Sequence, residues 1–175
     1  MLNNRKFTDK EIDTILDNMI ILVDTRERSN LHILDWCEYK NRVETKKMGL
    51  PNGDYSFMLK AIPELGIPND MYFHKEFVIE RKNSLDEISQ NFTKNRARFE
   101  HELSSYKGKL IIAIEDSWTN LFQGNYKSDY GRRSFIGSVF AFEHRYDVSF
   151  RFLKKEEIAV FIYGEMRYFL REKLK

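Results

Sequence analysis

Two short apolar segments constrain the fold of this chain more than any other feature. They are MIILVD at residues 19–24 and KLIIAIE at residues 109–115, and each stops at a carboxylate. A strand with one solvated face alternates apolar and polar residues, so an unbroken apolar strand must be covered on both faces. The two segments therefore predict a sheet that carries helices on both sides.

Helical and strand patterns surround these segments. We expect a short first helix after a capping box of Thr8 and Glu11. Further helices are expected at residues 31–40, 85–107 with a break near 91, 132–145 and 156–173, and further strands near 43 and at 54–59, 71–82 and 148–153. The strands at 54–59 and 71–82 should pair as a hairpin, which makes the sheet mixed. The expected fold class is α/β, a central mixed β-sheet flanked by helices, with residues 1–175 as a single domain.

Composition excludes several classes of protein. Hydrophobic residues make up 42% and charged residues 32% of the chain, which is typical of a globular domain. No apolar run approaches the roughly 20 residues of a membrane helix, and the start MLNNRKFTDK lacks the apolar core of a signal peptide. The single cysteine, Cys37, excludes an intramolecular disulfide framework and a cysteine zinc cluster. We therefore expect a cytoplasmic protein with no membrane partner. The net charge of +2 does not identify any other partner.

Acidic and basic side chains near the ends of predicted strands carry the chemistry. Asp24 ends the first apolar segment, and Asp54 follows the flexible Gly53 at the start of the next strand. Glu80 and Lys82 share one face of a strand, because side chains alternate every second residue. Three carboxylates around one point suit a hard cation such as Mg²⁺, which prefers oxygen ligands. The lysine could orient or help deprotonate a water molecule, so the pattern predicts metal-dependent phosphodiester hydrolysis.

Three motifs also give the chain a family resemblance. They are VDTRE at residues 23–27, GDY at 53–55 and ERKNSLD at 80–86. Their order and spacing resemble V-D-x-R-E, G-D-Y and E-R-K-x-x-x-D of the XPF-type structure-specific endonucleases, within the PD-(D/E)xK nuclease superfamily. The resemblance covers about residues 20–116 and implies a restriction-endonuclease-like nuclease domain.

The resemblance implies a role for each matching position. It implies that Asp54 and Glu80 are metal ligands and that Lys82 is the catalytic lysine; the strand-end position of Asp24 adds it as a third candidate ligand. Supporting active-site roles fall on Asp24, Glu27, Arg81 and Asp86. The implied cofactor is Mg²⁺ or Mn²⁺, and the implied substrate is DNA, at branched, fork or flap structures.

Basic residues near the motifs are candidates for contacts with DNA phosphates. Lys94, Arg96 and Arg98 follow the third motif on a predicted helix, and Arg26 lies in the first. Arg26 and Arg81 have an alternative role, since an arginine beside clustered carboxylates can neutralise them when no metal is present. Relatives often carry glutamine at the position of Glu102, so the resemblance assigns it no DNA contact.

Two further features concern partners and alternatives. The last predicted helix, at residues 156–173, is apolar on more than one side, and burial against a second copy would cover it; the resemblance also implies a homodimer, and a deep single-chain core is the alternative. Many relatives append a helix-hairpin-helix module, for which we expect no room here, so an auxiliary DNA-binding protein is a candidate partner. Glu115 and Asp116 could join the acidic cluster or face water. A non-catalytic DNA-binding subunit, and a nuclease acting on linear DNA or RNA, stay open as alternative functions.

Overall fold

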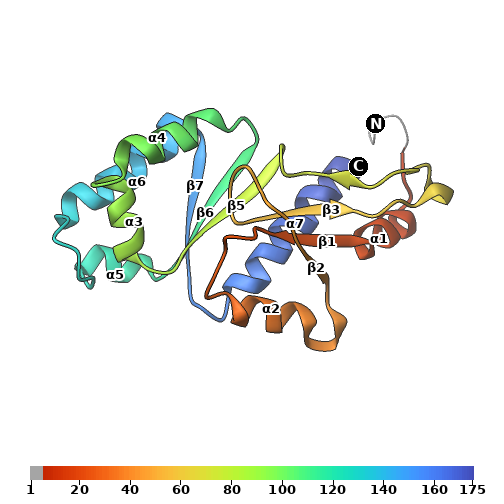
Figure 1. Cartoon of the computed structure of the whole chain (residues 1–175), viewed down its shortest axis with the longest axis horizontal. Helices are drawn as coiled ribbons and strands as arrows, with labels where there is room; N and C mark the ends of the chain where they lie inside the picture. Colours follow the sequence, from red (N-terminus) through yellow and green to blue (C-terminus); the bar gives the residue numbers. More distant parts are fainter. Residues whose placement is uncertain (1–5) are drawn as a thin grey trace.

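A mixed sheet forms the centre of the molecule (Figure 1). The computed structural model describes residues 6–175, so the first half of the segment MLNNRKFTDK lies outside the described residues. The sheet has seven strands in the order β2-β1-β3-β5-β6-β7, with β4 paired beside β3. Their bounds are β1 Met19–Val23, β2 Glu44–Lys47, β3 Tyr55–Leu59, β4 Met71–Tyr72, β5 Phe77–Lys82, β6 Lys109–Glu115 and β7 Val148–Leu153. β1 is parallel to β2 and antiparallel to β3, whereas β5, β6 and β7 are parallel, which confirms the predicted mixed sheet.

Helices cover both faces of the sheet, as the two apolar segments predict. The helices are α1 Asp9–Asp17, α2 Leu31–Glu38, α3 Leu85–Phe92, α4 Arg96–Ser105, α5 Trp118–Gln123, α6 Arg132–Tyr146 and α7 Ile158–Leu174, with single 3-10 turns at Tyr39–Asn41 and Pro63–Leu65. One core cluster joins α1, α2 and α7 to the sheet, and a second joins α3, α4 and α6 to its other face. Residues 110–114 of β6 are buried between these helix layers, whereas β1 is buried between the helices on one face and the loop residues Met48 and Leu50 on the other.

Three local predictions need correction. The strand predicted at residues 71–82 is interrupted by a turn in which the N–H of Glu76 donates to the carbonyl oxygen of Phe73 (2.8 Å). The helix predicted at residues 85–107 divides at 93–95, a few residues later than expected. Residues 118–123, for which the sequence pattern predicts no helix, form α5, whose first turn is capped by the side chain of Ser117.

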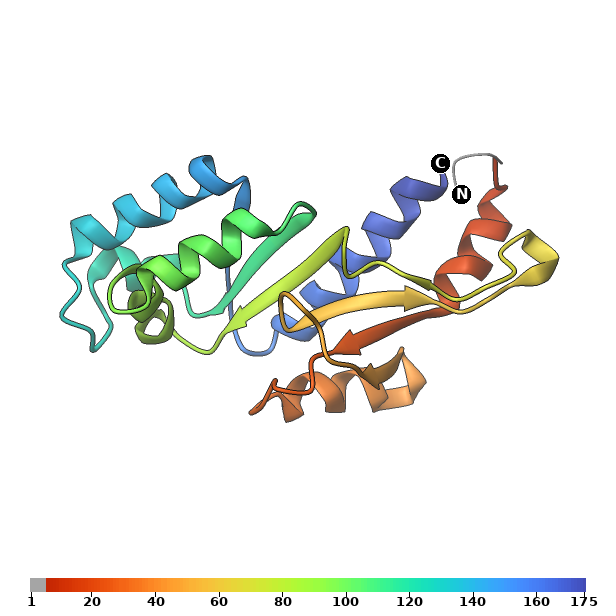
Figure 2. The same ribbon diagram turned by 45° about the horizontal axis from the view of Figure 1, so that its top comes forward.

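The last helix, α7, is covered by its own chain to a greater extent than its apolar pattern predicts. Its inner residues, among them Ile162, Met166 and Leu170, are fully buried in the core. Helices α1 and α2 pack against it from the same chain, and Figure 2 shows α1 and α7 side by side. Val160 and Tyr168 stay exposed, at 51% and 66%. Only a narrow outer strip of α7 is thus left for a partner. Within residues 6–175, no helix has the length and apolarity to cross a bilayer.

Candidate active site

Two neighbouring strands bring Asp54 and Glu80 together at one end of the sheet. β3 and β5 are antiparallel, and the N–H of Asp54 donates to the carbonyl oxygen of Ile79 (2.9 Å). Gly53 permits this close approach, because its φ is +70° and a Cβ there would lie 2.8 Å from the Cβ of Val78. The backbone therefore places the Asp54 carboxylate beside the end of β5.

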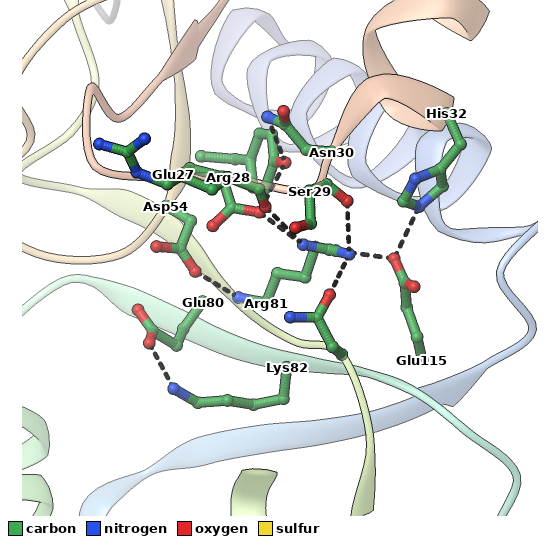
Figure 3. Close-up of polar contacts among 12 residues, drawn as sticks. Glu27, Arg28, Ser29, Asn30, His32, Asp54, Glu80, Arg81, Lys82 and Glu115 are labelled. Atoms are coloured by element: carbon green, nitrogen blue, oxygen red, sulfur yellow. Dashed lines mark hydrogen bonds and ion pairs between the residues drawn. The ribbon is translucent and has the colours of Figure 1, made fainter.

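The pleat of β5 separates the residues of the E-R-K motif. Successive side chains of a strand point to opposite faces of the sheet. Glu80 and Lys82 lie on the face of Val78, where α3 and α4 pack, and Arg81 lies on the face of Ile79, where α2 and α7 pack. Figure 3 shows Glu80 and Lys82 on one side of the strand and the guanidinium group of Arg81 on the other. The motif thus serves two separate clusters.

On the face of the sheet that carries Glu80, the hydrogen-bond donors near Asp54 and Glu80 do not fully balance the negative charge of the two carboxylates. Burial, followed by the charge of Glu80, raises the pKa of Asp54 to about 8, although a hydrogen bond from the N–H of Arg81 (2.8 Å) acts in the opposite direction. Burial would lower the pKa of Lys82, but its ion pairs with Glu80 (2.7 Å) and Glu87 (3.7 Å) outweigh burial and raise it. The amine of Lys82 is therefore a charged donor at neutral pH.

Asp54 and Glu80 fit a divalent cation. Oδ2 of Asp54 accepts from Arg81 and Oε1 of Glu80 accepts from Lys82, but their second oxygens make no hydrogen bond within residues 6–175. Repulsion from Glu80 helps to raise the pKa of Asp54. A cation between the two carboxylates would relieve this repulsion, and Mg²⁺ and Mn²⁺ take oxygen ligands. These two residues would hold the ion that the sequence predicts.

Asp24 does not join this pair, which corrects the predicted meeting of three carboxylates. Among residues 6–175, no three His, Cys, Asp or Glu side chains are grouped so that they could hold a metal ion. Asp24 is 1% exposed. Its carboxylate accepts from the N–H and Nε of Arg26 (2.8 and 2.7 Å) and from the N–H of Leu50 (2.6 Å). Burial would raise the pKa of Asp24, but these donors lower it. The carboxylate of Asp24 is therefore occupied by donors from its own loop and from Leu50.

Arg81 forms the centre of the second cluster, on the opposite face (Figure 3). Its side chain is 2% exposed, with Nη1 donating to Glu27 (2.6 Å) and Nε to Glu115 (2.7 Å), and it also contacts Asn83. His32 Nε2 lies 2.7 Å from the same oxygen of Glu115. Burial would lower the pKa of Arg81, but Glu115 and Glu27 raise it. Arg81 therefore neutralises the carboxylates of Glu27 and Glu115 in this arrangement.

A cleft of about 260 Å³ opens beside Asp54 and Glu80. Arg26 and Arg98 also line it, and their side chains are 71% and 82% exposed. Arg98 pairs with Glu102 (2.8 Å), which lines the same cleft. An anion that enters the cleft therefore meets exposed guanidinium groups beside the two carboxylates.

The remaining predicted residues lie elsewhere. Lys94 and Asp86 line a separate hollow of about 570 Å³. Oδ1 of Asp86 accepts from the N–H groups of Lys127 (2.8 Å) and Ser128 (2.7 Å), so this carboxylate anchors the loop after α5. Arg96 pairs with an acidic residue one turn along α4. Asp86 thus supports the fold near the site through a loop.

Sequence reasoning misses Glu87 and His32 as neighbours of the site, whereas Glu115, one of the two carboxylates considered for the acidic cluster, lies against Arg81. A local signal exists for Glu87, because its spacing from the helix cap Ser84 places it in the first turn after Lys82. No local signal links either Glu115 or His32 to Arg81, since Glu115 reaches Arg81 only through the pairing of β5 with β6, and His32 reaches Glu115 only through the position of α2.

Comparisons with known proteins agree with this geometry. The family model described as ERCC4 domain matches residues 23–164. The solved structure of XPF from Aeropyrum pernix superposes with a TM-score of 0.61 at 20% identity, and the match covers 87% of this chain and 65% of that one. XPF from Aeropyrum pernix in complex with DNA gives 0.61 at 19% identity, covering 89% and 67%. The chain thus spans about two thirds of these relatives. A search of curated sequences found no match.

Proposed function

This chain belongs to the ERCC4 domain family, and from that premise we propose that it is a divalent-metal-dependent endonuclease that hydrolyses DNA phosphodiester bonds. Nucleases of this family generally depend on a divalent metal ion. The observation that carries the proposal is the joint placement of Asp54, Glu80 and the charged Lys82 at the meeting of β3 and β5, beside an open cleft. The expected ion is Mg²⁺ or Mn²⁺.

Each residue of this group has a distinct part in the proposed reaction. A divalent cation bound there supplies Lewis acidity toward the phosphodiester and its attacking water. Asp54 and Glu80 would hold the cation, since each keeps one carboxylate oxygen that makes no hydrogen bond within residues 6–175. Lys82 keeps its proton, so it donates to the attacking water or to a phosphoryl oxygen and offsets the charge that develops there. The expected products are a 5′-phosphate and a 3′-hydroxyl.

We further propose that branched, fork or flap DNA is the substrate. The complex of the Aeropyrum pernix relative with DNA supports DNA as the ligand. Arg26 and Arg98 flank the carboxylates in the cleft, so they are the first candidates for phosphate contacts, with Lys94 and Arg96 further along the surface. Preference for branched DNA rests on family membership alone.

A nuclease assay with matched variants tests the proposal. Labelled flap, fork, linear duplex, single-stranded DNA and RNA would be incubated with the protein and Mg²⁺, Mn²⁺ or EDTA. We expect metal-dependent cutting of fork or flap DNA that is lost in Glu80→Gln and Lys82→Met. Lys107→Met, which removes an exposed lysine outside the cleft, should cut as the wild type does.

Three outcomes would contradict the proposal or a part of it. Binding of DNA without cutting in any metal would favour a non-catalytic DNA-binding subunit. Equal cutting of linear DNA or RNA would remove the preference for branches. Cutting that survives in both Glu80→Gln and Lys82→Met would place the catalytic site elsewhere.

We also propose a homodimer, an auxiliary DNA-binding protein and an intracellular location, as the sequence predicts. The exposed residues Val160 and Tyr168 of α7 support the dimer, and Tyr168 also lines a hollow of about 310 Å³ with Phe161 and Gly164. The strip is narrow, so the dimer needs a direct test. Light scattering that gives a monomer at micromolar concentration would exclude it.

A further inference from the structure

Glu115 and His32 begin a hydrogen-bonded chain that ends at Asp54. Nε2 of His32 lies 2.7 Å from Oε1 of Glu115, and Nε of Arg81 donates to the same oxygen (2.7 Å). An ionised carboxylate can only accept hydrogen bonds, so Nε2 of His32 carries a proton. At the other end of the chain, the backbone N–H of Arg81 donates to Oδ2 of Asp54 (2.8 Å). One residue, Arg81, therefore links the two faces of β5.

The register of the sheet explains why Glu115 reaches Arg81. β5 and β6 are parallel, with Arg81 opposite Ala113. Side chains of a strand repeat every second residue, so Glu115 follows Ala113 on the face of the sheet to which Arg81 points. Glu115 is the last residue of β6, and it contacts His32 in the first turn of α2. Its contact with Arg81 thus results from the fold and not from a chance surface rotamer.

Burial makes this contact decisive for the position of Arg81. The side chains of Arg81 and Glu115 are 2% and 7% exposed, so water cannot readily replace either partner. A buried guanidinium that loses one carboxylate must move or lose a hydrogen bond. Because the same residue donates its N–H to Asp54, such a movement changes the support of that carboxylate.

We propose that Glu115, held by His32, is a positioning residue for the metal-dependent reaction. It acts through Arg81 on Asp54 and touches neither the cation nor the DNA. The inference rests on the proposed function, because it treats Asp54 as a metal ligand. Residues behind a metal ligand commonly change metal affinity or activity 10–100-fold when they are replaced.

Metal binding measures this role without relying on activity. Mn²⁺ would be titrated into the full chain by calorimetry, for the wild type, Glu115→Gln, His32→Ala and the control Asp116→Asn. Asp116 follows Glu115 but bonds to Ser117 and Asn120 at the start of α5, away from Arg81. We expect Glu115→Gln to weaken Mn²⁺ binding about tenfold, His32→Ala to weaken it by a smaller factor, and the control to bind as the wild type does.

Two further readouts separate positioning from a general loss of structure. The amide proton of Arg81 should shift in NMR spectra of Glu115→Gln, because its hydrogen bond to Asp54 changes. On fork or flap DNA, kcat should fall while KM for DNA stays unchanged. A loss of stability alone would change neither the amide shift at native temperature nor the ratio of kcat to KM in this way.

The outcomes distinguish this inference from the function on which it rests. Wild-type binding of Mn²⁺ that Asp54→Asn does not weaken would overturn both. Wild-type binding that depends on Asp54 but is unchanged in Glu115→Gln would overturn the inference alone. If Glu115→Gln does not fold, His32→Ala decides, because it leaves Arg81 and Glu115 in place; equal Mn²⁺ affinity in that variant would refute the positioning role.

Discussion

Replacing Asp54 by asparagine should stabilise the metal-free protein at high pH, although it removes a proposed metal ligand. Burial and the charge of Glu80 raise the pKa of Asp54 from 3.8 to about 8. A group with a raised pKa binds more protons in the folded state than in the unfolded state between these values. Stability must therefore fall as pH rises from about 4 to about 8, and the full cost is present above pH 8. Asparagine carries no charge and can still accept from the N–H of Arg81.

The pKa of Asp54 bounds the size of this effect. A pKa difference of one corresponds to about 1.4 kcal/mol, so the whole shift corresponds to at most roughly 6 kcal/mol. Local relaxation lowers the cost of a buried charge. We therefore expect Asp54→Asn to raise the free energy of unfolding by about 2 kcal/mol at pH 9, and by little at pH 4.

Urea denaturation in EDTA at pH 4, 7 and 9 measures this difference. Asp24→Asn is the control with the opposite sign: burial would raise the pKa of Asp24, but Arg26 and the N–H of Leu50 lower it. Its replacement should cost about 2 kcal/mol at pH 7, and the cost should shrink in acid. A pH-independent effect of Asp54→Asn, or a loss of stability at pH 9, would refute the electrostatic account of the site.

Three further predictions concern the surroundings of Asp54. Gly53→Ala should lower the free energy of unfolding by about 2 kcal/mol, because φ is +70° and its Cβ would lie 2.8 Å from the Cβ of Val78; an unchanged melting temperature would contradict this. Arg81→Lys should cost about 3 kcal/mol in urea denaturation, since lysine cannot replace the several bonds of a buried guanidinium; a loss below about 1 kcal/mol would show that the buried cluster contributes little. Glu102→Gln should tighten DNA binding a few-fold in fluorescence anisotropy at low salt and not at high salt, because it frees Arg98 from an ion pair of 2.8 Å; an unchanged affinity would remove Arg98 from the DNA surface.

The layers of the fold follow from the sequence, but some element boundaries do not. Unbroken apolar runs identify β1 and β6 as covered on both faces, and the pairing of β3 with β5 makes the sheet mixed. The break between β4 and β5 has no Gly or Pro as a signal, because its turn is formed by Phe73, His74, Lys75 and Glu76. The cover on α7 depends on α1 and α2, which come from the other end of the chain.

Prediction of the site likewise depends partly on local sequence patterns and partly on contacts between residues far apart in the sequence. Strand alternation is enough to place Glu80 and Lys82 on one face, and the glycine before Asp54 marks the tight turn that brings it there. Alternation cannot show that the acceptor positions of Asp24 are filled by Arg26 and by the N–H of Leu50, which lies 26 residues away. For the same reason, a carboxylate at a strand end can be assigned to a metal site only when the hydrogen-bond donors that could occupy its oxygens are known.

The alternation along β5 has a consequence for how such a domain could change during evolution. Asp54 and Glu80, the carboxylates of the proposed metal site, line an open cleft and repel each other, whereas the side chain of Arg81 is buried among ion pairs. A duplicated copy that no longer needed to cut DNA could therefore accept substitutions at Glu80 and Lys82 and keep its fold, with equal or higher stability. Arg81 would be retained longer than Glu80 and Lys82. Its presence in a descendant would then indicate an intact fold, whereas Glu80 and Lys82 together would indicate an intact candidate nuclease site.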